Sequence, residues 1–293
     1  RTLVRTDVPF RERWVLFWAN HFTVSGSKRF VAPAIGAFER EAIRPHAFGR
    51  FEDMLQAVCA HPAMLIYLDN DRSVGENSVR ARRAKKKRGL NENFAREILE
   101  LHTLGVEGGY TQHDVRALAR ILTGWSHDLA SRGPRVSVES PIGFRFDERS
   151  HEPGSKRLLG LHYSESGVEE GRLALSRLAR HPSTARFIAT KLARHFVADT
   201  PPESAVDALA KTCQDSDGDL GAVCRAVIRL DVAWDSTGSK IKTPHELVIA
   251  TLRVLQLDEL PVKTLAASFA ELGQVPFMAP SPAGWPDRND EWI

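Results

Sequence analysis

Apolar residues recur at helical spacing along most of the chain. The first clear case follows Pro9, where apolar and aromatic positions spaced i, i+4, i+7 and i+11 share one face of a helix: Phe10, Trp14, Phe17 and His21. Similar spacing after residues that can cap a helix predicts further helices beginning near residues 61, 91, 111, 166, 181, 219 and 243. The pattern therefore favours a helical protein.

Strand-like alternation is confined to one stretch of the chain. Between residues 135 and 163, Val136 and Val138 alternate with polar residues, as do Phe144 and Phe146, and glycines follow. We therefore predict a mainly α, multi-helix single domain covering residues 1–293, with a small β-hairpin elaboration near residues 135–163.

Two segments interrupt the helical pattern. The first, residues 71–90, contains seven positive charges between Arg80 and Arg88 and no aromatic residue among them, which predicts a basic, mobile, solvated loop. A weak contact with a polyanion through Arg80 to Arg88 is the most that such a loop suggests, because platforms for base stacking are lacking. The second, residues 273–293, is rich in proline, and we expect an extended tail that packs on the body through Phe277 and Trp285.

Composition narrows the function classes without choosing one. Hydrophobic residues make up 42% of the 293 positions, and the net charge is only +3, so a field that attracts polyanions over the whole surface is not expected. Three cysteines without CxxC spacing, Cys59, Cys213 and Cys224, indicate neither a disulfide framework nor a zinc-thiolate site. No apolar run approaches the roughly 18 residues of a membrane span. The sequence also lacks GxSxG, GxxxxGK[ST] and a GxGxxG after a strand.

The helix expected from residue 91 to 104 carries the most informative polar groups. Glu97 lies at the edge of the apolar face of this helix, and Asn93 and Glu100 lie beside it. One interpretation pairs the two carboxylates with Arg96, Arg116 or Arg120, so that they brace the helices. The other makes Glu97 and Glu100 an acid/base pair or a source of metal oxygens. We favour bracing, because structural ion pairs are common at such positions.

Two histidines extend this candidate catalytic set. His21 shares the apolar face of the first helix, next to Asn20, and His102 follows Glu100 by two residues. Such an inward histidine is more often a hydrogen-bonded core residue than a ligand. Glutamate and histidine side chains such as these four can bind zinc or iron. Neither HExxH nor paired ExxH spacing is present, however, so the cofactor stays unknown.

Other side chains are candidates for binding. Lys240 and Lys242 precede the helix expected near residue 243 and could present ammonium groups to an anion. Asn20 and Asn93 are polar neighbours of the candidate carboxylates and histidines. Three tryptophans could line a groove: Trp18, Trp125 and Trp285.

Several strings, taken together and in order, resemble the domain of unknown function family numbered 1800. They are FWANHF at residues 17–22, LNENFARE at 90–97, ELHTLGV at 100–106, GYTQ at 109–112, LTGW at 122–125, HP at 181–182 and GWP at 284–286. The set covers nearly the whole chain, and its combination is more specific than any single string.

The resemblance implies a bacterial, commonly exported, largely helical protein, often encoded beside a companion protein that resembles the alkaline phosphatase superfamily. Members of the family are longer at the amino end, so a leading segment is expected to be missing from this chain, which begins at Arg1. The resemblance implies no settled activity and transfers no catalytic residue. Two hypotheses follow: a helical binding or assembly module, which we favour, or a hydrolase or lyase acting on a polymer.

Overall fold

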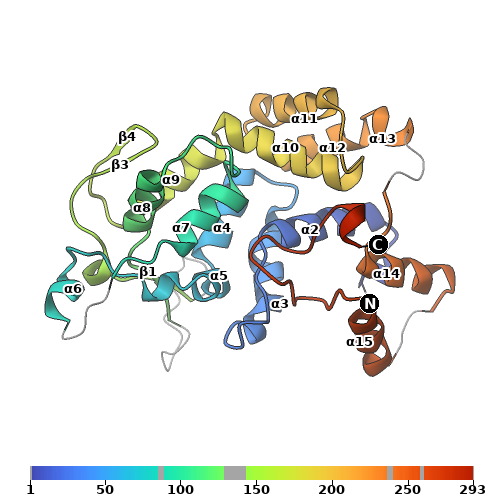
Figure 1. Ribbon diagram of the computed structural model, residues 1–293, viewed down its shortest axis with the longest axis horizontal. Helices are drawn as coiled ribbons and strands as arrows, with labels where there is room; N and C mark the ends of the chain where they lie inside the picture. Colours follow the sequence, from blue (N-terminus) through green and yellow to red (C-terminus); the bar gives the residue numbers. More distant parts are fainter. Residues whose placement is uncertain (1, 85–88, 129–142, 236–239, 258–260, 293) are drawn as a thin grey trace.

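Helices dominate the computed structural model, which describes residues 2–84, 89–128, 143–235, 240–257 and 261–292 (Figure 1). This confirms the mainly α fold class. The α-helices are α1 (Thr2–Arg5), α2 (Pro9–His21), α3 (Ile35–Phe38), α4 (Phe51–Ala60), α5 (Pro62–Tyr67), α6 (Val79–Arg83), α7 (Asn93–Glu97), α8 (Gln112–Ile121), α9 (Val168–Ala179), α10 (Pro182–Phe196), α11 (Glu203–Asp215), α12 (Leu220–Ile228), α13 (Val232–Asp235), α14 (Pro244–Val254) and α15 (Val262–Glu271). Short 3-10 turns are η1 (Ala32–Ala34), η3 (Arg44–His46), η4 (Asn70–Arg72), η6 (Glu148–Ser150) and η7 (Asn289–Glu291).

Side-chain caps explain where many of these helices begin. Thr111 and Asp114 form a capping box at α8, and Thr243 and Glu246 form another at α14. The repeated His-Pro turn has a similar basis, because the ring Nδ1 of the histidine accepts a hydrogen bond from the backbone N–H two residues later, at α5 and again at α10. Proline fits directly after such a cap, since its missing N–H would have no partner there.

Two turns widen into π-helix. They are η2 (Glu39–Ile43) and η5 (Ile98–His102), and η5 continues α7 directly. A π turn holds one residue more than an α turn, and such turns occur often at functional sites. The candidates Glu100 and His102 both lie on η5.

Among the described residues, the strands form two separate antiparallel pairs. Strand β1 (Trp125–His127) pairs with β2 (Phe144–Phe146), and β3 (Lys156–Leu158) pairs with β4 (Leu161–Tyr163). The second pair is the small hairpin expected within residues 135–163, with Leu159 and Gly160 at positive φ in its two-residue turn. Val136 and Val138 lie outside the described residues.

One hydrophobic core runs through the body of the molecule. Its buried members extend along the sequence from Trp14 to Val227, and α2 supplies the aromatic centre, where Trp14 and Trp18 lie 5.9 Å apart, ring centroid to ring centroid, in an edge arrangement. Helices α10, α11 and α12 stack on one another along one edge of the body, and α4 packs against α9 (Figure 1).

Helices α14 and α15 lie apart from this core, at the opposite end of the long axis from β3 and β4 (Figure 1). Among the described residues, neither contributes a side chain to the core cluster. Each buries little: Pro244 and Leu252 in α14, and Phe269 in α15. Instead, α14 contacts α1 and α15.

The tail after residue 273 returns across α2, as Figure 1 shows in red. The side chain of Asn20 donates to the carbonyl of Trp285 at 3.0 Å and accepts from its N–H at 2.8 Å. Gly284 is needed beside this contact, because it has φ +89° and an added Cβ would lie 2.6 Å from the carbonyl oxygen of Asn20. Trp285 is half-buried, whereas the side chain of Phe277 is 53% exposed. Phe277 holds the tail through its backbone instead, because its carbonyl accepts a 2.7 Å hydrogen bond from the N–H of Gly26.

The basic segment is not a loop throughout. Residues Val79–Arg83 form α6, capped by Ser78, and Arg80 makes a 3.0 Å salt bridge with Asp147. Arg82 donates to the carbonyl of Asn77. The expectation of a basic loop over residues 71–90 is therefore wrong for this part, because a cap and an acidic neighbour stabilise a short helix; residues 85–88 lie outside the described residues.

Candidate functional site

Glu97 and Glu100 lie half-buried, on α7 and η5 respectively. Glu100 accepts a hydrogen bond from the hydroxyl of Tyr110 at 3.3 Å. Glu97 makes no hydrogen bond or salt bridge with another described residue. Asn93, at the start of α7, is exposed and does not hold Glu97.

The arginines expected to brace Glu97 bind other carboxylates. Arg116 and Arg120 both bind Glu76, at 3.1 Å and 2.8 Å. Arg96 lies 3.4 Å from Glu92 and also donates to Gln112. The bracing interpretation is therefore wrong for Glu97, because Glu76 takes Arg116 and Arg120 through the tertiary fold and Glu92 takes Arg96 one turn away on the chain.

Glu97 is partly buried and makes no salt bridge with another described residue, and its pKa is shifted upward. Burial is the main cause and the nearby Glu100 carboxylate adds to it, while Arg96 opposes both. Burial, with the charge of Glu97, raises the pKa of Tyr67 to about 12. Burial and Glu100 also raise the pKa of Tyr110. The arrangement is an acidic pair flanked by two phenols, in which Glu97 holds its proton more readily than a solvated glutamate does.

His21 and His102 come together in the core, with ring centroids 6.2 Å apart. The His21 Nε2–H donates to the carbonyl of His102 at 3.1 Å, which leaves Nδ1 of His21 as an acceptor. That Nδ1 and both ring nitrogens of His102 are buried without a hydrogen-bond partner among the described residues. Burial lowers the pKa of His102 to about 3 and that of His21 well below its usual range, so both imidazoles are neutral near pH 7.

The four catalytic candidates therefore form two groups, not one. The histidines are enclosed in the core, whereas the glutamates lie at its edge. Within the described ranges, no three His, Cys, Asp or Glu side chains are placed to hold a metal ion together. The ligand types noted in the sequence are thus not gathered into one site.

The candidate binding residues are mostly engaged in structure. Trp18 and Trp125 are 0% and 1% exposed, so they cannot line an open groove. Lys240 lies 2.6 Å from Asp199 and also donates to the carbonyl of Asp287, which attaches the tail rather than presenting a free ammonium group. Asn20 is occupied by Trp285, and Lys242 is exposed at the start of α14.

A buried polar network, missed by the sequence analysis, lies beside β3. The Nε2 of His151 is 3.2 Å from Glu170, and the ammonium of Lys156 is 2.8 Å from the same carboxylate. Burial alone would raise the pKa of Glu170, but hydrogen bonds from His151 and Lys156 hold it below its usual value. The three side chains are at most 5% exposed. Their spacing in the sequence follows no motif, so only the fold reveals them.

Lys191, on α10, is a second residue that the sequence did not single out. Burial lowers the pKa of its ammonium to about 8, although the carboxylate of Asp287 opposes the shift. Its charge also contributes to the low pKa values of His21 and His102. The ring of Phe187 lies between Lys191 and His21, with its centroid 5.7 Å from the Lys191 ammonium and 6.3 Å from the His21 ring centroid.

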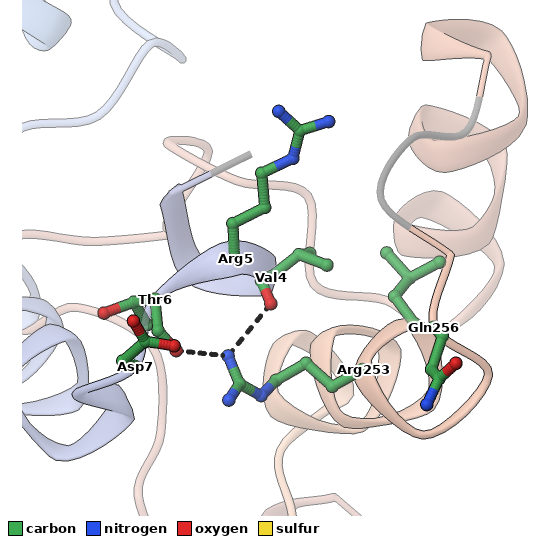
Figure 2. A pocket seen from close by; sticks show the side chains of 7 residues that line it. Val4, Arg5, Thr6, Asp7, Arg253 and Gln256 are labelled. Atoms are coloured by element: carbon green, nitrogen blue, oxygen red, sulfur yellow. Dashed lines mark hydrogen bonds between the residues drawn. The ribbon is translucent and has the colours of Figure 1, made fainter.

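A pocket of about 340 Å³ opens between α1 and α14. Figure 2 shows Arg253 donating to the carbonyls of Val4 and Thr6, while the side chain of Arg5 points away. None of the candidate residues lines this pocket; its lining is Val4, Arg5, Thr6, Asp7, Leu252, Arg253 and Gln256.

The fold and these sites define a mainly helical protein with a buried histidine pair and no assembled metal centre among its described residues. The chain belongs to the family described as "Protein of unknown function (DUF1800)", whose model matches residues 1–293. No curated protein and no solved structure matches the chain. None of the described helices is long and apolar enough to cross a membrane.

Proposed function

We propose that the protein is a helical binding or assembly module that docks a protein partner on α14, α15 and the start of the tail. The observation that carries the proposal is the exposed apolar surface of this region. Of nineteen large hydrophobic side chains exposed among the described residues, nine lie between positions 247 and 278: Leu247, Val254, Leu255, Leu257, Val262, Leu272, Val275, Phe277 and Met278.

Clustering of this kind supports an interface, because exposed apolar residues on a monomeric surface are normally scattered singly. Val254 and Val262 are 82% and 81% exposed. A partner that covered them would gain roughly 25 cal/mol for each Å² of apolar surface removed from water. We propose that this partner is the exported companion protein that resembles the alkaline phosphatase superfamily; the family resemblance supports its choice.

The experiment places charges on this surface. Val254→Glu together with Val262→Glu should weaken binding to the purified companion protein at least tenfold, as measured by isothermal titration calorimetry. Val106→Glu is the matched control, because Val106 is 70% exposed on another part of the surface. Binding that is unchanged by the paired substitution, or equally weakened by the control, would contradict the proposed surface.

A hydrolase or lyase acting on a polymer is the alternative, and Glu97 favours it. A half-buried carboxylate with a raised pKa and no salt bridge to the described residues suits proton transfer, with Glu100 as its neighbour. Turnover of a soluble polysaccharide or polypeptide by the wild-type protein, lost in Glu97→Gln but retained in Glu92→Gln, would establish this function in place of the binding module.

A further inference from the structure

The guanidinium group of Arg253, on α14, is held along one edge only. Its Nη1 donates at 2.9–3.2 Å to three backbone carbonyls at the end of α1, those of Leu3, Val4 and Thr6. Figure 2 shows the bonds to Val4 and Thr6. The Nε and Nη2 groups make no hydrogen bond or salt bridge with another described residue. Arg253 also lines the pocket of about 340 Å³ between α1 and α14, so an unused guanidinium edge is available there.

The unused edge has the geometry that a carboxylate prefers. The Nε–H and one Nη2–H of an arginine are parallel, and they donate together to the two oxygens of one carboxylate. The backbone carbonyls already hold Arg253 in place, so little further side-chain freedom is lost when a ligand binds. This edge therefore indicates a ligand that carries a carboxylate.

A carboxylate of the protein, that of Asp7, lines the same pocket. Asp7 is exposed and makes no hydrogen bond or salt bridge with another described residue, Arg253 included. The Thr6 hydroxyl is in use, because it accepts a 3.1 Å hydrogen bond from the N–H of Val8. An unpaired carboxylate binds an ammonium group through charge-assisted hydrogen bonds. The pocket thus offers one anionic and one cationic group that do not neutralise each other directly.

The size and lining of the pocket favour a small polar ligand. Its volume of about 340 Å³ is near the lower end of the range for small-molecule sites, roughly 300–1,000 Å³. Only Val4 and Leu252 are apolar among the described residues that line it. A large apolar ligand would leave the charged groups without partners, whereas a ligand with two opposite charges would pair with both.

We propose that the pocket between α1 and α14 binds a small amino acid. The carboxylate of the ligand accepts from the Nε–H and Nη2–H of Arg253, and its ammonium group donates to Asp7. This site does not depend on the docking of a protein partner, because none of the nine exposed apolar residues between positions 247 and 278 lines the pocket.

The probes are three amino acids, each compared with the carboxylate of the same length that lacks the amino group. The pairs are glycine with acetate, β-alanine with propionate, and 4-aminobutyrate with butyrate. Saturation-transfer difference NMR on the full chain measures their binding directly and does not depend on stability. At least one amino acid should bind about tenfold more tightly than its matched carboxylate, because it forms a second charge-assisted contact.

Two variants separate the contributions of the two charges. Asp7→Asn should reduce the affinity for that amino acid to the level of its matched carboxylate. Arg253→Gln should weaken the binding of both about tenfold or more. Asp231→Asn is the control, because Asp231 is exposed and does not line the pocket.

Thermal unfolding checks that each variant folds. If Arg253→Gln does not fold, Asp7→Asn still decides the outcome, because the Asp7 side chain makes no hydrogen bond or salt bridge with another described residue. The proposal is overturned if no amino acid binds better than its matched carboxylate, if Asp7→Asn keeps the preference, or if Asp231→Asn removes it.

Discussion

Helices α4 and α15 have the same length of ten residues but different surroundings. In α4 the apolar stripe is buried in the core, through Phe51, Met54, Leu55, Val58, Cys59 and Ala60. In α15 only Phe269 is buried, and Val262 is 81% exposed. An apolar stripe therefore shows that a helix has a face that favours burial. It does not show whether other residues of the same chain pack against that face.

Polar contacts differ between the two regions in the same way. The body encloses buried charged groups such as His151, Lys156 and Glu170, which lie within 3.2 Å of one another through the Glu170 carboxylate. The α14–α15 pair is attached by contacts nearer the surface, including the 2.8 Å salt bridge between Arg13 and Glu246. Stability should thus be concentrated in the body, while α14 and α15 stay available for docking.

The strongest test of this difference removes one aromatic side chain from the core. Trp18→Ala should lower the free energy of unfolding by about 3–5 kcal/mol, because Trp18 is fully buried. Val262→Ala, on α15, should change it by less than about 0.5 kcal/mol. Urea denaturation measures both values. Losses of similar size would mean that α15 is packed as firmly as α2.

The buried network should be nearly as sensitive. Glu170→Gln leaves Lys156 without its carboxylate in the interior, and we expect a loss of about 3 kcal/mol in urea denaturation. Glu169→Gln is the control on the same helix, since the Glu169 side chain is 58% exposed. A negligible effect of Glu170→Gln would show that water reaches the side chains of this network.

The buried histidines should make the body sensitive to acid. The pKa of His102 is about 3 in the folded protein, against an ordinary value of 6.5, so the unfolded chain binds more protons between these values. Its contribution to stability is therefore present above pH 6.5 and is lost as the pH falls toward 3. Between pH 7 and pH 5 the loss should be about 2 kcal/mol.

His102→Leu is the variant that isolates this effect, because leucine does not titrate. Its free energy of unfolding should fall less between pH 7 and pH 5 than that of the wild-type protein, by about the same 2 kcal/mol. His21, whose pKa is lowered too, acts in the same direction in both proteins. Equal pH dependence of the two proteins would show that His102 is accessible to protons in the fold.

Glu97 should give the smallest effect, with the opposite sign. Because burial raises its pKa and no salt bridge to the described residues compensates, its charge disfavours the folded state at pH 7. Glu97→Gln should therefore raise the Tm by about 1 °C. As the pH falls through the raised pKa toward 4.5, the wild-type protein should recover this difference. A clear drop in Tm at pH 7 would restore the bracing interpretation.

Side-chain caps explain only in part which helices were predictable from the sequence, because α2 and α9 were predicted without one and α6 was missed although Ser78 caps it. The starts of α8, α12 and α14 carry side-chain caps, and all three were predicted. Helices α4, α11 and α15 were missed, and their N-cap residues, Arg50, Pro202 and Pro261, make no side-chain cap hydrogen bond. These helices depend on tertiary contacts or on the apolar pattern alone, which is less specific than a cap.

The candidate site was predictable only in part, for a related reason. Periodicity placed His21 inward, and the structure buries it. Periodicity could not decide which carboxylate Arg116 and Arg120 would bind, because Glu76 reaches them from a distant part of the sequence. The surroundings of Lys191 combine residues near positions 21, 102 and 287, and no local pattern can indicate such a combination.

The π turn at η5 has a consequence for changes in chain length. In a regular helix such as α8, loss of one codon would rotate every later residue by about 100° and move the apolar stripe off the core. In η5 the turn already contains one surplus residue, so loss of one codon between Ile98 and His102 would leave an ordinary α turn with both flanks in place. This short segment is where we expect natural length variation to be tolerated within the buried body of the protein.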